Sequence, residues 1–137
     1  MPARQPLVLC VEDEFGGSEH RILLDRHGYH VIAVTSAGEG LSVLREKPVD
    51  AIILNLGVPG TNGGAVVRRM KKVKPHIPVL LVCPSASIPP GRSSPADGVV
   101  VKNEAPVRLL EVLDDLLNVR FPFFSRWFGN WKHRVGA

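Results

Sequence analysis

Five short apolar runs, separated by segments with helical periodicity, constrain the fold of this chain more than any other feature. Each run is nearly continuous in apolar residues, which is typical of parallel strands covered on both faces. Strands of this kind that alternate with helices predict an α/β protein with a doubly wound, five-stranded parallel sheet. The predicted strands are Leu7–Val11, His30–Val34, Asp50–Leu54, Pro78–Cys83 and Gly98–Lys102.

Local helix signals occupy the segments between the predicted strands. The segment Phe15–His27 ends at Gly28, a residue type that is common just past a helix end because it adopts positive φ without strain. Ser36 and Glu39 have the spacing of a capping box and predict a helix that runs to about Lys47. Apolar spacing predicts two further helices, one after Gly63 and one from Pro106 to Leu117.

The connection between the fourth and fifth predicted strands differs from the others because it is rich in proline. The prolines of this segment, which runs to Ala96, are Pro84, Pro89, Pro90 and Pro95. A proline inside a helix removes a backbone donor and clashes with the preceding turn, at a cost of about 3 kcal/mol. The sequence therefore predicts a degenerate fourth helix, replaced by a short turn or an open loop.

Charge and aromatic content divide the chain into two parts. Residues 1–118 hold 13 Lys and Arg and 13 Asp and Glu, whereas residues 119–137 hold four Lys and Arg and no acid. We therefore expect a folded domain over residues 1–118 and a basic, aromatic C-terminal tail over residues 119–137. The large side chains that recur at helical spacing in this tail are Phe124, Trp127, Phe128 and Trp131.

The aromatic side chains of the tail need a surface that covers them, since burying one such side chain is worth about 1.5–3 kcal/mol. The available surfaces are the chain's own domain, a second copy, another protein or a membrane interface. We expect the tail to bind a protein partner or to form a homodimer, because apolar patches often mark interfaces. A membrane surface is the alternative for a basic segment with Trp and Phe.

Several function classes find no support in the sequence. No apolar run approaches the roughly 18 residues that a membrane span needs, and residues 1–6 lack the apolar core of a signal peptide. Cys10 and Cys83 lie in apolar segments and are expected to be reduced core thiols of a cytoplasmic protein. No nucleotide-binding loop, histidine-rich metal motif or activated nucleophile is visible, so we expect neither an enzyme nor a resident cofactor.

Polar residues gather at the carboxyl ends of the predicted strands, the edge at which doubly wound sheets bind ligands. Glu12 and Asp13 follow the first strand, Asn55 follows the third, and Cys83 and Lys102 end the fourth and fifth. Two acids and a lysine predict a small polar pocket for a divalent cation or an anion. The alternative is a capped sheet edge with an ion pair between Asp13 and Lys102.

Four segments form a recognisable pattern by their order and spacing: Val8–Glu14, Val49–Gly63, Ile77–Val82 and Ala96–Lys102. They resemble the receiver domain of two-component response regulators, and the resemblance extends over residues 6–118. It implies a flavodoxin-like receiver fold and a role in phosphorelay signal transduction. In that family a histidine kinase supplies a phosphoryl group to an aspartate at the end of the third strand. A magnesium ion, held by the acidic pair and that aspartate, neutralises the phosphate.

The phosphoacceptor position implied by this resemblance is occupied by Asn55. A carboxylate can form an acyl phosphate, whereas a neutral amide is a poor nucleophile. Asn55 also removes one negative charge from the implied magnesium site, where Glu12 and Asp13 would be the remaining acidic ligands. The resemblance thus implies that phosphorylation is lost and that magnesium binding is weak or lost.

Three further positions depart from the family pattern. The family places Thr or Ser at the end of the fourth strand, where this chain has Cys83, a much weaker hydrogen-bond donor. Val99 stands where the family has an aromatic residue that swings on activation, and Asn103 rather than proline follows the pocket lysine, Lys102. Together with the degenerate fourth helix, these changes fall on one signalling route and indicate a pseudo-receiver.

We therefore interpret the chain as an atypical response-regulator receiver module that is not phosphorylated and acts through protein–protein contacts. The alternative is a non-covalent switch that binds Mg²⁺ or a small anionic ligand in the vestigial pocket of Glu12, Asp13 and Lys102.

The third predicted helix is strongly basic. Its cations are Arg68, Arg69, Lys71, Lys72 and Lys74. Such a cluster can mark the binding site of an acidic partner or of nucleic acid. A solvated helix face is the preferred interpretation, because residues 1–118 are neutral overall and no nucleic-acid-binding motif accompanies the cluster. No nucleic-acid partner is therefore expected.

Overall fold

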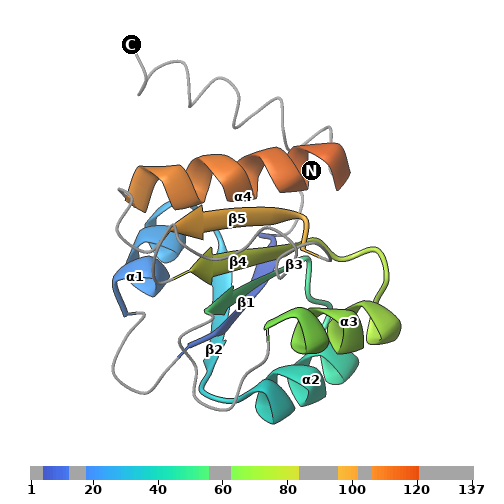
Figure 1. Cartoon of the computed structure of the whole chain (residues 1–137). Coiled ribbons are helices and arrows are strands. Elements are labelled where there is room, and N and C mark those ends of the chain that lie inside the picture. The colour runs from blue at the N-terminus through green and yellow to red at the C-terminus, as the bar shows by residue number, and fades with distance from the viewer. Residues whose placement is uncertain (1–4, 13–17, 56–62, 84–95, 102–105, 121–137) are drawn as a thin grey trace.

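The computed structural model describes residues 5–12, 18–55, 63–83, 96–101 and 106–120. Over these ranges the chain forms five strands and four helices, in the alternation that the sequence predicts (Figure 1). The strands are β1 (Leu7–Val11), β2 (His30–Val34), β3 (Ala51–Asn55), β4 (Val79–Cys83) and β5 (Gly98–Val101). The helices are α1 (Ser18–Arg26), α2 (Ala37–Glu46), α3 (Gly63–Val73) and α4 (Pro106–Arg120).

The five strands form one parallel sheet in the order β2-β1-β3-β4-β5. Helices α1 and α4 cover one face of the sheet, and α2 and α3 cover the other (Figure 1). This arrangement confirms the predicted doubly wound α/β fold. The direction of winding reverses between β1 and β3, so the carboxyl ends of these two strands form the edge at which such sheets bind ligands.

The central strands β1, β3 and β4 are buried along their whole length. On one face they pack with α2 and α3 around Leu9, Leu54 and Met70. On the other face they pack with α1 and α4, where Leu24 and Leu113 are fully buried. Burial on both faces explains why these strands are continuous apolar runs in the sequence and do not alternate between apolar and polar residues.

Two local helix signals read from the sequence are confirmed. Gly28 follows the end of α1 with φ at 89°, in the left-handed region that favours glycine. At the start of α2, the hydroxyl oxygen of Ser36 accepts a hydrogen bond from the backbone N–H of Glu39 at 3.1 Å. The Glu39 carboxylate accepts in turn from the Ser36 hydroxyl at 3.2 Å. The predicted capping pair therefore fixes where α2 begins.

Strand β3 is shifted by one residue from its predicted range, because Asp50 has a separate role. The Asp50 carboxylate accepts a hydrogen bond from the backbone N–H of Leu7 at 2.7 Å, and the Asp50 N–H donates to the Leu7 carbonyl oxygen at 2.7 Å. The two contacts join the starts of β1 and β3. Asp50 is buried, and this pairing compensates for the loss of hydration of its carboxylate.

The chain's last described helix, α4, continues to Arg120, so the predicted domain boundary at residue 118 falls in its final turn. The proline-rich segment 84–95 and the tail residues 121–137 lie outside the described residues, and the predictions made for them stay predictions. In the part of the chain that the structure describes, no helix combines the length and apolar character that crossing a membrane requires.

Candidate functional site at the carboxyl edge of the sheet

Three of the predicted site residues come together at the carboxyl edge of the sheet. Glu12 directly follows β1, Asn55 ends β3 and Cys83 ends β4. The strands β1, β3 and β4 are neighbours, and their register pairs Val11 with Leu54 and Asn55 with Val82. Glu12 is therefore level with Asn55, and Cys83 lies one residue further along the next strand.

All three side chains are buried although two of them are polar. The exposed fractions are 8% for Glu12, 6% for Asn55 and 2% for Cys83. Glu12 is held in place through its backbone N–H, which donates to the carbonyl oxygen of Val34 on β2 at 2.9 Å. A carboxylate and a carboxamide therefore lie together at a buried sheet edge, where their access to water is restricted.

The electrostatic influence of Glu12 extends to the neighbouring thiol on β1. Burial raises the pKa of Cys10, and the negative charge of Glu12 raises it further. Burial also raises the pKa of Cys83. Both cysteines are reduced and stay in the thiol form at neutral pH, so neither has the thiolate character of a catalytic nucleophile.

Val99 does not belong to this cluster. It lies on the edge strand β5, where its register partner is Leu81, two residues before the end of β4. At 42% exposed it is one of the two large apolar side chains that are most open to solvent among the described residues. Its register partner Leu81 packs on the side of the sheet that α2 and α3 cover, so Val99 is placed on that side too.

The second acid and the lysine of the predicted pocket, Asp13 and Lys102, lie outside the described residues. The same holds for the four aromatic residues of the tail, namely Phe124, Trp127, Phe128 and Trp131. Their predicted roles in the pocket and at an interface stay predictions.

The donor atoms in the described part of the site do not by themselves make a magnesium site. They comprise one carboxylate, Glu12, and the amide oxygen of Asn55, whereas Mg²⁺ is usually bound through carboxylates and water. Nowhere within the described ranges do three His, Cys, Asp or Glu side chains gather as metal ligands would. A complete ligand set at this edge would need Asp13.

Two pairings of polar residues could not be recognised from the sequence. Lys71, read as part of the basic run of the third helix, donates to the Asp97 carboxylate at 2.6 Å and to the Ile77 carbonyl oxygen at 3.0 Å. On the other face, Asp114 of α4 is buried; burial raises the pKa of Tyr29, and the charge of Asp114 raises it further. Only the apolar spacing of α4 hinted at the burial of position 114.

Comparison with known proteins decides the family of this chain. Residues 8–114 match the model of the response regulator receiver domain. The chain belongs to the response regulator receiver domain family. Proteins of this family act in two-component signal transduction. The match confirms the resemblance that the four sequence segments indicated.

Curated relatives and solved structures agree with this assignment. The receiver domain is 32% identical over 108 residues to the transcriptional regulatory protein GlrR of Escherichia coli, an alignment that covers 76% of this chain. It has a TM-score of 0.75 to a CheY-like receiver domain of Methanospirillum hungatei, at 23% identity, covering 83% of this chain and 94% of that one.

It also matches a chain in the crystal structure of the histidine kinase ThkA in complex with the response regulator TrrA. That match has a TM-score of 0.71 and 27% identity, and it covers 82% of this chain and 99% of that one. The receiver domain described here spans about a quarter of the length of GlrR, since the aligned region covers 24% of that protein.

Proposed function

We propose that this receiver domain is an atypical member of its family that is not phosphorylated and that signals through protein–protein contacts. The observation that supports the proposal is the place of Asn55 at the end of β3, buried and level with Glu12. By the resemblance, this is the position of the phosphoaccepting aspartate. A carboxamide has no anionic oxygen and its nitrogen lone pair is delocalised, so Asn55 lacks the carboxylate nucleophile that forms an acyl phosphate.

Cys83 and Val99 support the same proposal. A hydroxyl at the end of β4 would be a strong hydrogen-bond donor to a phosphoryl group, whereas the buried thiol of Cys83 is a weak one. Val99 has no aromatic ring that could move between a buried and an exposed position. The receiver fold is therefore kept, while the residues at the positions of the phosphoacceptor, of the hydroxyl donor and of the switching aromatic ring are replaced.

Mass spectrometry after incubation with acetyl phosphate and magnesium tests this proposal. The wild-type chain is expected to gain no phosphoryl group at this edge. The matched control is Asn55→Asp, together with the double variant Asn55→Asp/Cys83→Thr, and at least the double variant should gain one. A phosphoryl group mapped to Asn55, Glu12 or their neighbours in the wild-type chain would overturn the proposal.

The proposed module has no catalytic turnover and no resident cofactor of its own, and we place it in the cytoplasm. Two reduced, buried cysteines are consistent with a reducing compartment. Its partners are proteins: TrrA is seen in complex with the histidine kinase ThkA, and GlrR is a transcriptional regulatory protein. We infer that other signalling proteins bind this receiver domain as well.

The proposal assigns an assembly role to residues 121–137, whose aromatic side chains include Trp127 and Trp131. Light scattering of the full chain and of a chain that ends at Arg120, where α4 ends, tests this role. The full chain is expected to form a dimer and the shortened chain a monomer. The same number of copies per particle in both chains would exclude the tail as the element that joins two copies.

A further inference from the structure

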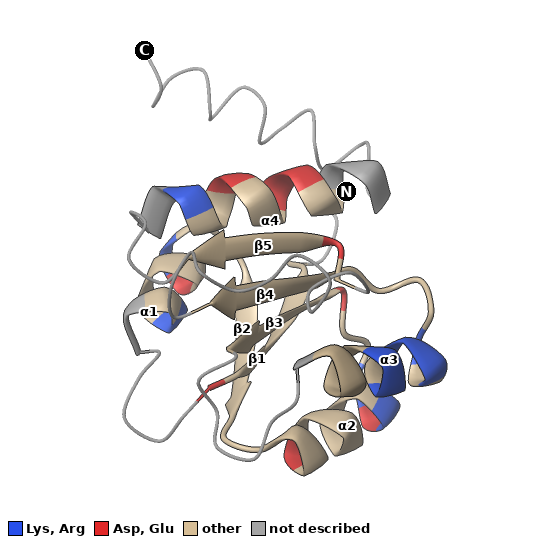
Figure 2. Cartoon of the chain, in the orientation of Figure 1, with Lys and Arg blue, Asp and Glu red and all other residues tan. Residues whose placement is uncertain are grey.

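A group of cations lies on the solvent-exposed side of α3, from the middle of the helix to its last turn. Arg68, Arg69 and Lys72 are exposed, and α3 contains no acidic residue. Figure 2 shows these cations together over the half of α3 that is nearer its C-terminus. We call this group the α3 basic surface.

The neighbouring cation Lys71 differs from these three because it has an ion-pair partner. Lys71 forms an ion pair with Asp97, and this contact joins α3 to the residue that precedes β5. Among the described residues, Arg68, Arg69 and Lys72 have no such ion-pair partner. The positive charges of the α3 basic surface are therefore not neutralised by ion pairs within the described residues.

This arrangement works against the stability of the isolated helix. Arg68 and Lys72 are four residues apart and Arg69 and Lys72 three apart, and like charges at these spacings repel by about 0.2–0.5 kcal/mol per pair. The helix dipole favours a cation in the last turn, where Lys72 lies. That effect fades within one turn, so it does not account for Arg68 or Arg69.

The end of α2 adds to the same surface. Helices α2 and α3 pack against each other, and their C-terminal ends lie side by side (Figures 1 and 2). The last residues of α2 and its C-cap, Arg45, Glu46 and Lys47, are all exposed and carry one net positive charge. The positive surface therefore extends across two helices.

A cavity of about 270 Å³ lies just beyond the C-terminal ends of α2 and α3 in the chain, between residues 48–50 and residues 74–77. Its walls are largely apolar, with Val49, Ile77 and two prolines, and its charged groups are of both signs, Lys74 and Asp50. The volume lies just below the roughly 300–1,000 Å³ of pockets that hold whole small molecules. Its volume and its largely apolar walls suit a single apolar side chain.

We propose that the α3 basic surface and this cavity dock an acidic peptide segment of a partner protein, with one apolar side chain of the segment in the cavity. Charge complementarity selects carboxylates for Arg68, Arg69 and Lys72, and the cavity selects an apolar anchor. Residues 45–50 and 68–77 contain no Phe, Tyr or Trp on which nucleic-acid bases could stack, which disfavours a single-stranded nucleic acid.

This inference goes beyond the proposed function and does not depend on it, because it uses no residue of the Asn55 edge and its cavity lies where β3 and β4 begin. Failure of the phosphorylation test would leave it intact, and its own failure would leave the proposed function intact.

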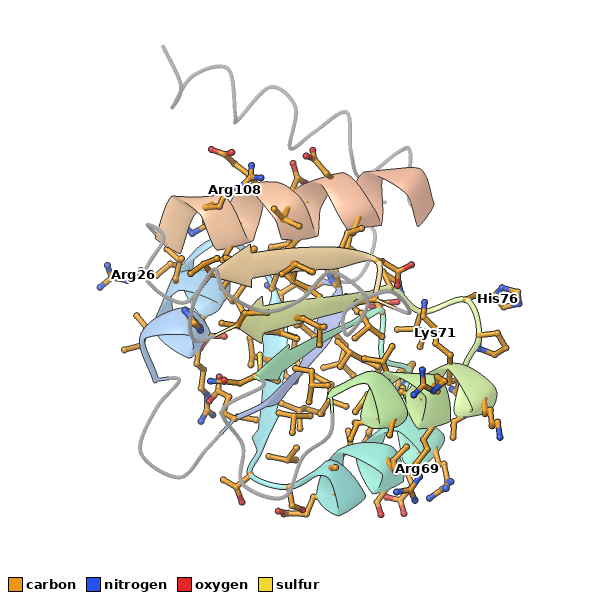
Figure 3. All side chains as sticks on the ribbon, viewed as in Figure 1. Arg26, Arg69, Lys71, His76 and Arg108 are labelled. Atoms are coloured by element: carbon orange, nitrogen blue, oxygen red, sulfur yellow. The ribbon has the colours of Figure 1, made fainter. Side chains whose placement is uncertain are left out.

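Fluorescence anisotropy with the full chain and a fluorescein-labelled polyglutamate peptide that contains one central leucine tests the charge requirement. Arg69→Glu is expected to weaken binding by about tenfold. The matched control is Arg26→Glu, an equal change in charge at an exposed arginine in the last turn of α1, distant from α3 in Figure 3. The control should change binding by less than about twofold. Equal losses in the two variants, or no binding by the wild-type chain, would overturn the proposal.

The cavity requirement is tested with the same peptide in which glycine replaces leucine. The glycine peptide is expected to bind about tenfold more weakly, since the buried apolar side chain is lost. Equal binding of both peptides would overturn the role of the cavity. Tighter binding of an oligo(dT) strand of the same charge would overturn the assignment to an acidic peptide and would indicate a nucleic acid.

Discussion

The ammonium group of Lys71 lies 2.6 Å from the carboxylate of Asp97, although the two residues are 26 positions apart in the sequence. The same carboxylate oxygen accepts a hydrogen bond from the backbone N–H of Val79 at 2.7 Å. Asp97 therefore connects α3, the start of β4 and the residue before β5. This contact lies at the amino-terminal edge of the sheet, the edge opposite the one that carries Asn55.

Removing the cation of this contact should destabilise the domain. Lys71→Met keeps most of the apolar stem but removes the bonds to Asp97 and Ile77. We expect a loss of about 0.5–1.5 kcal/mol in the free energy of unfolding, because the pair is partly exposed and screened by solvent. Urea denaturation of Lys71→Met and of the exposed neighbour Lys72→Met measures the difference. A loss of equal size in Lys72→Met would contradict the specific role of Lys71.

Two glycines in adjacent parts of the chain should respond to alanine in opposite directions. Gly28 has φ at 89°, so Gly28→Ala forces an alanine into the left-handed region at a cost of about 1–2 kcal/mol. Gly38 lies inside α2, and an added Cβ there would meet nothing within 4 Å. Gly38→Ala should stabilise the domain by about 0.5–1 kcal/mol. Thermal unfolding of the two variants measures both changes in melting temperature. A fall in both melting temperatures would refute the helix argument for Gly38.

Alkaline pH should destabilise the domain through two buried neutral groups. Burial first, and then the charge of Glu12, raises the pKa of Cys10, while burial and Asp114 raise that of Tyr29. The ordinary pKa values, 9.0 and 10.0, apply to the unfolded chain. The stabilisation is therefore complete below about pH 9 and is lost as pH rises, because the unfolded chain releases these protons first.

The loss amounts to at most about 1.4 kcal/mol per pH unit for each group. Urea denaturation between about pH 8 and pH 11, with a reducing agent present, measures the slope. Tyr29→Phe should remove the part of the slope that begins near the ordinary tyrosine pKa of 10.0. An identical slope in the wild-type chain and in Tyr29→Phe would show that the phenol of Tyr29 ionises as readily in the folded chain.

Restoring a carboxylate at the end of β3 should make stability depend on magnesium. Asn55→Asp places a second acid level with buried Glu12, and the repulsion and loss of hydration should cost about 1–3 kcal/mol without metal. A divalent cation bound between the two acids would recover part of this loss. Melting temperatures with MgCl₂, and with NaCl at the same ionic strength, measure the effect. A wild-type chain stabilised by magnesium as strongly as the variant would favour a non-covalent metal switch.

The parts of this structure that were predictable from the sequence are those that depend on local pattern. Apolar runs placed all five strands to within one residue, and the positions of Glu12, Asn55 and Cys83 at strand ends were enough to bring them to one edge. The capping pair of Ser36 and Glu39 was equally local. Each of these features rests on spacing within a few residues or on the fixed geometry of a parallel sheet.

The parts that the sequence did not reveal depend on tertiary packing. Lys71 looked like four other cations of its segment, and only the position of Asp97 beside the start of β4 separates it from them. Asp50 looked like the first residue of a strand, because nothing local shows that its carboxylate would pair with Leu7. The partners of Asp13, Lys102 and the aromatic tail stay predictions.

Strands of five residues set the distance between the two ends of this molecule at about 17 Å. Asn55 and Asp50 lie at opposite ends of this distance, so substitutions at the two ends are expected to have additive effects on stability. In evolutionary terms, the two ends are free to diverge separately. A lineage can give up phosphate chemistry at one end and keep changing its recognition properties at the other, without rebuilding the scaffold that joins them.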